Sequence, residues 1–269
     1  MMLPTVVAGL RLAVRCFSDE KSGAVIMPPL YGPFRMSVEL NHRTICAAPL
    51  TRDENARYSI DYEAVEKQLQ NGCHLVLFCN PHNPVSRAWS RDELQQLLDL
   101  CLRYKATLIS DEIHADFVYA PNVFTPMLSL PGAENCVVTL TSPTKTFNIP
   151  GLQQAMVICR NPDLLQKMKD EADAAGIASG NIFGRAAAIA AYSQCDDWLD
   201  GMLNYLDESR RIVREQVTEK LPKVILSPIE ATALCWLDFR AYGKTSKELY
   251  EAFKSHGIIL NEGTFFGPV

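Results

Sequence analysis

The sequence alternates short, largely apolar runs with segments of helical spacing, and this alternation constrains the fold more than any other feature. The apolar runs are residues 24–27, 75–79, 107–110, 136–141 and 155–159. Each run has the length of a buried β-strand rather than of a helix. Strands that are apolar on both faces belong to sheets covered by helices on both sides, and such sheets are mostly parallel. The sequence therefore predicts an α/β fold, with a mostly parallel sheet sandwiched by helices.

Helices are predicted between these strands. Residues 5–16 and 62–70 place apolar side chains at helical spacing, and Ser90 with Glu93 forms a capping-box pattern at the start of another helix. Strand, helix and strand over residues 75–110 make one right-handed crossover unit. In sheets of this kind, ligands bind beyond the carboxyl ends of the strands. The polar residues that directly follow strands are therefore the candidates for function.

The last quarter of the chain has a different character. Residues 196–219 predict one long helix, 231–239 a strand and 247–256 a second helix. The apolar residues of the long helix predict its buried side: Trp198, Leu199, Leu203, Leu206, Ile212, Val213 and Val217. We therefore expect a large domain over residues 1–195 and part of a smaller α+β domain over residues 196–269.

Charge and cysteine content narrow the classes of function. Lys and Arg total 26 against 31 Asp and Glu, and no dense basic run breaks this balance, so neither nucleic acid nor an anionic membrane is expected as a partner. No run of 18 apolar residues predicts a membrane span. The nine cysteines are odd in number and lack C-x-x-C spacing, which predicts buried, reduced thiols in a cytoplasmic protein. The five histidines show no ligand spacing, so no metal site is expected.

Lys145 is the first candidate for chemistry. It follows the strand at 136–141 and a Ser-Pro-Thr turn. A lone lysine in this place is usually a solvated surface residue. A lysine that is partly desolvated at a strand end loses its proton more readily and can attack carbonyl groups as a Schiff-base nucleophile.

Asp111 and His114 follow another apolar strand. Asp111 could simply be a helix N-cap, and His114 could be a structural histidine. Alternatively, an ionised Asp111 could hold a heteroaromatic nitrogen in its protonated form, which is what pyridoxal phosphate requires. His114 could then support Asp111 or donate towards the phenolic oxygen of that cofactor.

Three further residues have both a structural and a functional interpretation. Asn83 lies between two prolines and favours a turn, but its amide could also donate to the cofactor. Tyr31 is by default a half-buried loop aromatic, although its ring could stack on a pyridine face. Ser142 could cap a helix or offer its hydroxyl to a phosphate.

The sequences of these motifs and their order along the chain resemble those of a known family. N-P-H-N-P at 80–84, S-D-E-I-H-A-D at 110–116 and S-P-T-K-T-F-N-I-P-G-L at 142–152 are similar to fold-type I pyridoxal-phosphate enzymes of the class I/II aminotransferase superfamily. Within it they most resemble the cystathionine β-lyase branch, the MalY/PatB-type carbon–sulfur lyases. Similarity continues through residues 28–34, 190–200 and 233–240, and so covers essentially the whole chain.

The resemblance implies a role for each candidate. Lys145 would form the Schiff base with pyridoxal phosphate and act as general base and acid at Cα. Asp111 would bind the pyridine nitrogen, and Asn83 and His114 would lie near the phenolic oxygen. The resemblance also implies that Ser142 lies near the phosphate and that Tyr31 stacks on the ring.

The resemblance implies a lyase that cleaves a small sulfur amino acid to a thiol, pyruvate and ammonia. An aminotransferase remains the alternative, since the same lysine serves both reactions. A third interpretation is a non-catalytic binding module or an inactive fragment.

Members of the family are homodimers and are longer than this chain. The present sequence begins at the helix after the family's glycine-containing phosphate turn. It ends at Val269, before the expected substrate-carboxylate arginine and just after the matching loop at 263–267. We therefore expect a fragment that lacks both ends and is a poor catalyst alone.

Overall fold

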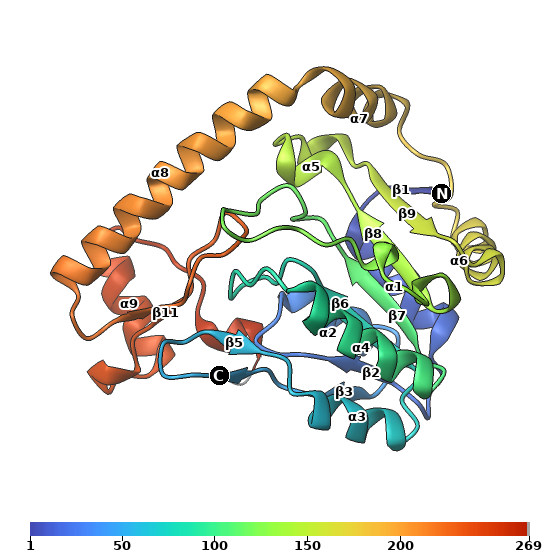
Figure 1. Cartoon of the computed structure of the whole chain (residues 1–269), viewed down its shortest axis with the longest axis horizontal. Helices are drawn as coiled ribbons and strands as arrows, with labels where there is room; N and C mark the ends of the chain where they lie inside the picture. Colours follow the sequence, from blue (N-terminus) through green and yellow to red (C-terminus); the bar gives the residue numbers. More distant parts are fainter. Residues whose placement is uncertain (268–269) are drawn as a thin grey trace.

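The computed structural model describes residues 1–267 and is built around a seven-stranded sheet (Figure 1). In spatial order its strands are β1 (Met2–Leu3), β9 (Ala155–Cys159), β8 (Val137–Thr141), β7 (Thr107–Asp111), β6 (Leu75–Cys79), β2 (Ala24–Ile26) and β3 (Ile45–Ala47). The β8–β7, β7–β6, β6–β2 and β2–β3 pairs are parallel, whereas β9 is antiparallel to both of its neighbours. The prediction of a mostly parallel sheet is confirmed.

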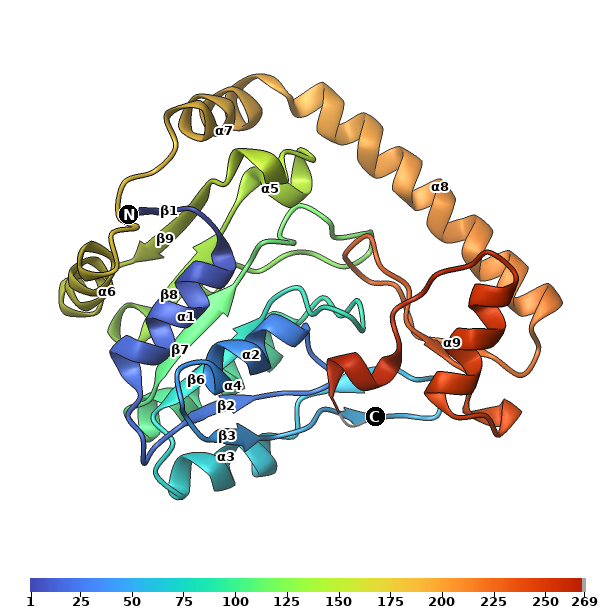
Figure 2. The same cartoon turned by 180° about the vertical axis from the view of Figure 1, so that it is seen from behind.

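Helices cover both faces of this sheet (Figures 1 and 2). Helices α1 (Val6–Phe17), α2 (Gly32–Glu39) and α6 (Pro162–Ala174) lie on one face, and α3 (Tyr62–Gln70) and α4 (Arg91–Arg103) lie on the other. Alternate side chains of β6 enter the two cores, with Leu77 facing α1 and Phe78 facing α4. This two-sided burial explains why the strands are continuously apolar in the sequence.

The remaining elements are short or lie outside the main sheet. Two small antiparallel sheets pair β4 (Thr51–Arg52) with β5 (Tyr58–Ser59), and β10 (Ile225–Leu226) with β11 (Leu237–Asp238). The other helices are α5 (Pro143–Thr146), α7 (Ile182–Gln194), α8 (Asp196–Lys220) and α9 (Ser246–Ser255). Single 3-10 turns occupy Met127–Ser129, Ala133–Asn135, Pro150–Leu152, Arg240–Tyr242 and Gly263–Phe266.

The long helix α8 is present as predicted, but its predicted burial is wrong. Figure 1 shows α7 and α8 as an arch along one side of the sheet. Of the residues in α8 only Val217 is buried, and Trp198 and Ile212 are 47% and 45% exposed. An apolar stripe predicts which side of a helix packs, but it does not say whether the packing partner lies in the same chain.

The predicted strand at 231–239 is mostly irregular. Only Leu237 and Asp238 form a strand, and Ala231 makes a single bridge to Val118. Thr232 has a φ of +64°, so the backbone turns where the prediction continued it straight. The helix predicted over 247–256 is confirmed as α9. The division into domains at residues 195 and 196 stays a prediction.

The expectation that all nine cysteines are free thiols is wrong for one pair. Cys46 in β3 and Cys73 before β6 form a disulfide, and their Cα atoms are 7.0 Å apart. The parallel alignment of the edge strand with the sheet brings them together across 27 residues, so no local spacing announces the pair. The other seven cysteines are free.

Candidate active site

Five of the six predicted site residues line one cavity of about 180 Å³. They are Lys145, Asp111, His114, Asn83 and Tyr31. The cavity lies at the carboxyl ends of β6 and β7, because Cys79 and Asp111, the last residues of these two neighbouring strands, are partners in the sheet and both line it. The topology therefore gathers these side chains from four separate stretches of sequence, as expected for ligand sites at the carboxyl ends of parallel strands.

Asp111 is a buried carboxyl group that lines the cavity. It is 4% exposed, and its Oδ1 accepts a hydrogen bond from the amide of Ile113 at 3.1 Å. Burial raises the pKa of Asp111 to about 7 and outweighs this bond, while Glu112 raises it further and Lys145 lowers it. No helix follows Asp111, so the capping interpretation fails. A buried carboxyl group in this state is suited to a cationic partner that enters the cavity.

His114 is also buried, at 7% exposed. Burial lowers the pKa of His114 to about 4, and the charge of Lys145 acts in the same direction. Its ring is therefore neutral at physiological pH. Its Nδ1 is buried and has no hydrogen-bond partner among residues 1–267, so a polar group entering the cavity could satisfy it.

Tyr31 and Asn83 are held side by side through their backbones. The amide of Tyr31 donates to the carbonyl oxygen of Asn83 at 3.1 Å. Tyr31 is also the residue before helix α2, which begins with Gly32-Pro33. Burial raises the pKa of the Tyr31 hydroxyl, and the nearby Asp111 carboxyl adds to this effect, so the ring stays neutral.

Lys145 lies in the short helix α5 and reaches the cavity from its rim. It is an exposed residue, so the expected desolvation of Lys145 is not found in the described chain. Helix α5 is fixed from behind, because the hydroxyl of Thr146 donates to Asp116 at 2.6 Å and Phe147 packs edge-on against Tyr192. The backbone at Lys145 is therefore fixed, whereas its side chain is exposed.

Ser142 is not brought into the cavity. Its hydroxyl donates to the carbonyl oxygen of Gln154 at 2.6 Å and accepts from the amide of Thr144 at 3.1 Å. These bonds make Ser142 the cap of α5, which was its structural interpretation. Thr144, its neighbour in this cap, lines the cavity instead.

The cavity has further walls that the sequence analysis did not single out. The first turn of α1 contributes Val6 and Val7, and its cap Thr5 lies beside them. The predicted helix over 5–16 could have indicated this wall, since helix N-termini attract anions. Cys79 and Gln153 also line the cavity, but no local signal marks Gln153.

The described residues give two further results about the chain's chemistry. Within residues 1–267 no cluster of three or more His, Cys, Asp or Glu side chains is arranged to hold a metal ion. Among the helices described, none has the length and apolar character needed to cross a membrane.

The fold and the cavity define a class of protein, an α/β protein with a ligand site at the carboxyl ends of parallel strands, in which a lysine faces a buried carboxyl group. The chain belongs to the family of class I and II aminotransferases, whose model matches residues 1–268. This family assignment agrees with the resemblance found in the sequence.

Several relatives and structural neighbours are named as carbon–sulfur lyases. The chain is 39% identical to cystathionine β-lyase PatB of Bacillus subtilis over 98% of its own length and 69% of that protein. Among solved structures, cystalysin of Treponema denticola, which contains pyridoxal 5′-phosphate, is similar with a TM-score of 0.95 and 34% identity, over 99% of this chain and 68% of that one. A pyridoxal-phosphate-bound C–S lyase of Staphylococcus hominis has a TM-score of 0.92 and 31% identity, over 100% and 68%. The chain thus spans slightly more than two thirds of these relatives.

Proposed function

We propose that the chain is part of a pyridoxal-phosphate-dependent carbon–sulfur β-lyase that acts on a small sulfur amino acid. The observation that carries the proposal is the convergence of Lys145 and the buried Asp111 on one cavity, in a chain whose relatives are named as lyases of this type. The substrate class comes from those names, and the chemistry comes from the residues.

The residues of the cavity fit pyridoxal phosphate. Within residues 1–267 the buried carboxyl group of Asp111 forms no ion pair, and a protonated pyridine nitrogen would supply a cationic partner. Asn83 offers an amide, and the buried Nδ1 of His114 offers an unmatched ring nitrogen, to oxygens on the ring. The first turn of α1 provides a helix N-terminus for a phosphate.

When bound, pyridoxal phosphate acts as an electron sink for the Cα of an amino acid. Asp111 would pair with the ring nitrogen and favour its cationic form, and that pairing would lower the pKa of the carboxyl group from its raised value. Tyr31 lines the same cavity, and its aromatic ring would restrict the position of the cofactor ring.

Lys145 moves the protons. Its amine takes the proton from Cα of the substrate and can return it to a neighbouring atom, which is general base and acid catalysis by one group. The exposed tip of Lys145 leaves it free to move between these positions, while Thr146 and Phe147 hold its backbone. In the net reaction the Cβ–S bond breaks, and water converts the remainder to pyruvate and ammonia while the thiol leaves.

We also propose that the intact protein is a homodimer. Helices α7 and α8 expose large apolar side chains, including Ile182 at 74%, Phe183 at 72% and Tyr205 at 74%. Exposed large apolar side chains on two consecutive helices support an interface with a second copy of the chain.

The proposal is tested by adding pyridoxal phosphate to the purified chain and recording the absorbance of the bound cofactor. We expect a bound-cofactor band that is lost in Lys145→Ala, and pyruvate formation from cystathionine that falls by at least about 10³-fold in the same variant. Lys169→Ala removes an exposed lysine on α6 and serves as the matched control.

The outcomes separate the alternatives. Amino exchange with a 2-oxo acid in place of pyruvate formation would identify an aminotransferase. A folded chain that binds no pyridoxal phosphate would contradict the proposal and favour a binding module.

A further inference from the structure

A segment far along the chain, residues 230–232, is fastened to the loop that carries Asn83. The amides of Glu230 and Ala231 both donate to the carbonyl oxygen of Ser86 at 3.0 Å. The hydroxyl oxygens of Ser86 and Thr232 lie 3.0 Å apart, and both residues are 1% exposed. The Asn83 loop therefore has a buried, hydrogen-bonded contact with the C-terminal part of the chain.

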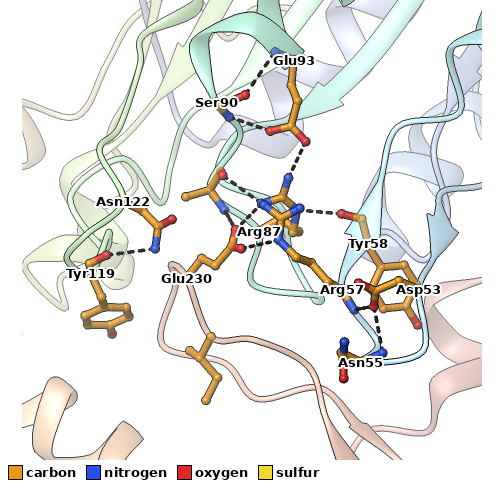
Figure 3. Close-up of polar contacts among 12 residues, drawn as sticks. Asp53, Asn55, Arg57, Tyr58, Arg87, Ser90, Glu93, Tyr119, Asn122 and Glu230 are labelled. Carbon is orange, nitrogen blue, oxygen red and sulfur yellow. Dashed lines mark hydrogen bonds and ion pairs between the residues drawn. The ribbon is translucent and has the colours of Figure 1, made fainter.

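The carboxylate of Glu230 makes a second set of contacts with the same loop (Figure 3). It forms an ion pair with Arg87 and accepts a hydrogen bond from the amide of Ala88 at 3.1 Å. Its other oxygen accepts from Nε of Arg57 at 2.9 Å. Glu230 is 8% exposed and Arg87 is 1% exposed, so this pair is shielded from solvent.

Arg87 is fixed on its other sides as well. Its Nε donates to the carbonyl oxygen of Tyr58 at 2.7 Å, it pairs with Glu93 in the capping box of α4, and its guanidinium lies 4.6 Å from the ring centroid of Trp89. These contacts hold the guanidinium of Arg87 in its buried position. Removing the charge of Glu230 would therefore leave a buried positive charge that is only partly compensated, by Glu93.

The loop that carries Asn83 is a tight turn with one unusual backbone conformation. The amide of His82 donates to Arg87 and the amide of Ser86 donates back to His82, each at 2.9 Å, so residues 82–87 form a closed turn that includes Asn83. Ser86 has a φ of +58°, a conformation that non-glycine residues adopt rarely and that surrounding contacts must maintain. Those surrounding contacts come largely from residues 230–232.

We propose that Glu230 is a positioning residue for Asn83, and that through it the C-terminal part of the chain sets the geometry of the cofactor site. Glu230 itself does not line the cavity. It acts by holding Ser86, Arg87 and Ala88, which in turn hold the turn around Asn83. The inference rests on the proposed function only in that Asn83 contacts pyridoxal phosphate.

The chain offers a matched control. Arg52 and Asp238 form another ion pair between the same two parts of the chain, at 2.5 Å, and within residues 1–267 neither side chain hydrogen-bonds to the loop at 82–87. Asp238→Asn therefore removes an equivalent charge without touching the Asn83 loop. Comparing Glu230→Gln with Asp238→Asn separates positioning of Asn83 from general attachment of the C-terminal part.

The first measurement needs no cofactor. Amide hydrogen exchange of the free chain should show faster exchange at Ser86 and Ala88 in Glu230→Gln, and unchanged exchange there in Asp238→Asn. Equal exchange at these amides in both variants and the wild-type chain would overturn the inference, whatever the chain binds.

The second measurement is the dissociation constant for pyridoxal phosphate, read from the absorbance of the bound cofactor. Glu230→Gln should weaken binding about tenfold and shift the band, as loss of a supporting contact commonly does. The same substitution in an Asn83→Ala background should have no further effect, because its action passes through Asn83. Additive effects in the double variant would contradict the inference.

Two further results keep the tests independent. If Glu230→Gln does not fold, Glu230→Asp retains the charge with a shorter side chain and should show the same pattern to a smaller degree. If the wild-type chain binds no pyridoxal phosphate, the proposed function fails, and the hydrogen-exchange result alone decides whether Glu230 holds the Asn83 loop.

Discussion

Helices α4 and α9 begin with the same local sequence signal but differ in how much of their surface is buried. Ser90 with Glu93 and Thr245 with Glu248 each form a complete capping box. Helix α4 then buries five residues against the sheet, whereas α9 buries none. A capping box therefore starts a helix wherever it occurs, but burial requires a facing surface, and the sheet provides one for α4.

The site follows the same division. All residues that line the candidate cavity lie between Pro4 and Gln153, around the sheet. The C-terminal part contacts this region at several points, among them residues 230–232, the Arg52–Asp238 ion pair, and the carbonyl oxygen of Phe266, which accepts from the amide of Leu30 at 2.8 Å. The sheet region thus supplies the chemistry, and the C-terminal part supplies support at a few points.

The largest expected effect tests the buried charge of the sheet region. Burial raises the pKa of Asp111 to about 7, so between about pH 4 and pH 7 the folded chain keeps a proton that the unfolded chain has released. Stability should fall as pH rises through this window, and Asp111→Asn should remove the part of the fall that Asp111 causes. Burial also raises the pKa of the neighbouring Glu112 to about 7, so both proteins keep the contribution of Glu112. At pH 8 the variant should be more stable than the wild type, without cofactor, by on the order of 4 kcal/mol.

Urea unfolding at pH 4 and pH 8 measures this difference. Comparing the two proteins at each pH cancels the opposite contribution of His114, whose lowered pKa of about 4 makes stability rise with pH. If the stability difference between Asp111→Asn and the wild type does not change with pH, the carboxyl group of Asp111 does not have a raised pKa in the folded chain.

Truncating one leucine in each region should give the next largest change in stability. Leu98 in α4 is fully buried, whereas Leu206 in α8 is only partly buried. Leu98→Ala should lower the free energy of unfolding by about 3 kcal/mol, and Leu206→Ala by less than about 1 kcal/mol. Urea denaturation of both variants measures the contrast, and equal losses would mean that α8 packs more tightly than its exposure indicates.

The two capping boxes give the smallest effect. Ser90→Ala should cost about 1 kcal/mol of global stability, because α4 is part of the main core. Thr245→Ala removes the same cap, but it should mainly increase fraying at the start of α9. Hydrogen exchange at the first turn of each helix, together with global unfolding, separates local from global loss. If Thr245→Ala lowers the global free energy of unfolding as much as Ser90→Ala does, the two regions do not differ in the way proposed.

Much of the fold could be predicted because its signals are local. The strand at 75–79 was predicted at its observed bounds, and the helix at 62–70 and the capping box at Ser90 are also confirmed. The convergence of Lys145, Asp111 and Asn83 could be predicted as well, since it depends only on the order of parallel strands. The sequences of the motifs indicated the family, and the match of the family model to residues 1–268 confirms it.

The sequence by itself thus determined which segments become strands and helices, and which polar residues meet at the rim of the sheet. Only the tertiary structure decided that Ser142 caps α5 instead of lining the cavity, that Cys46 pairs with Cys73, and that α8 stays largely exposed. It also decided that Glu230 holds the Asn83 loop from 147 positions along the chain. The physical reason is that propensity and periodicity act over a few residues, whereas burial and pairing depend on which distant surface arrives opposite each side chain.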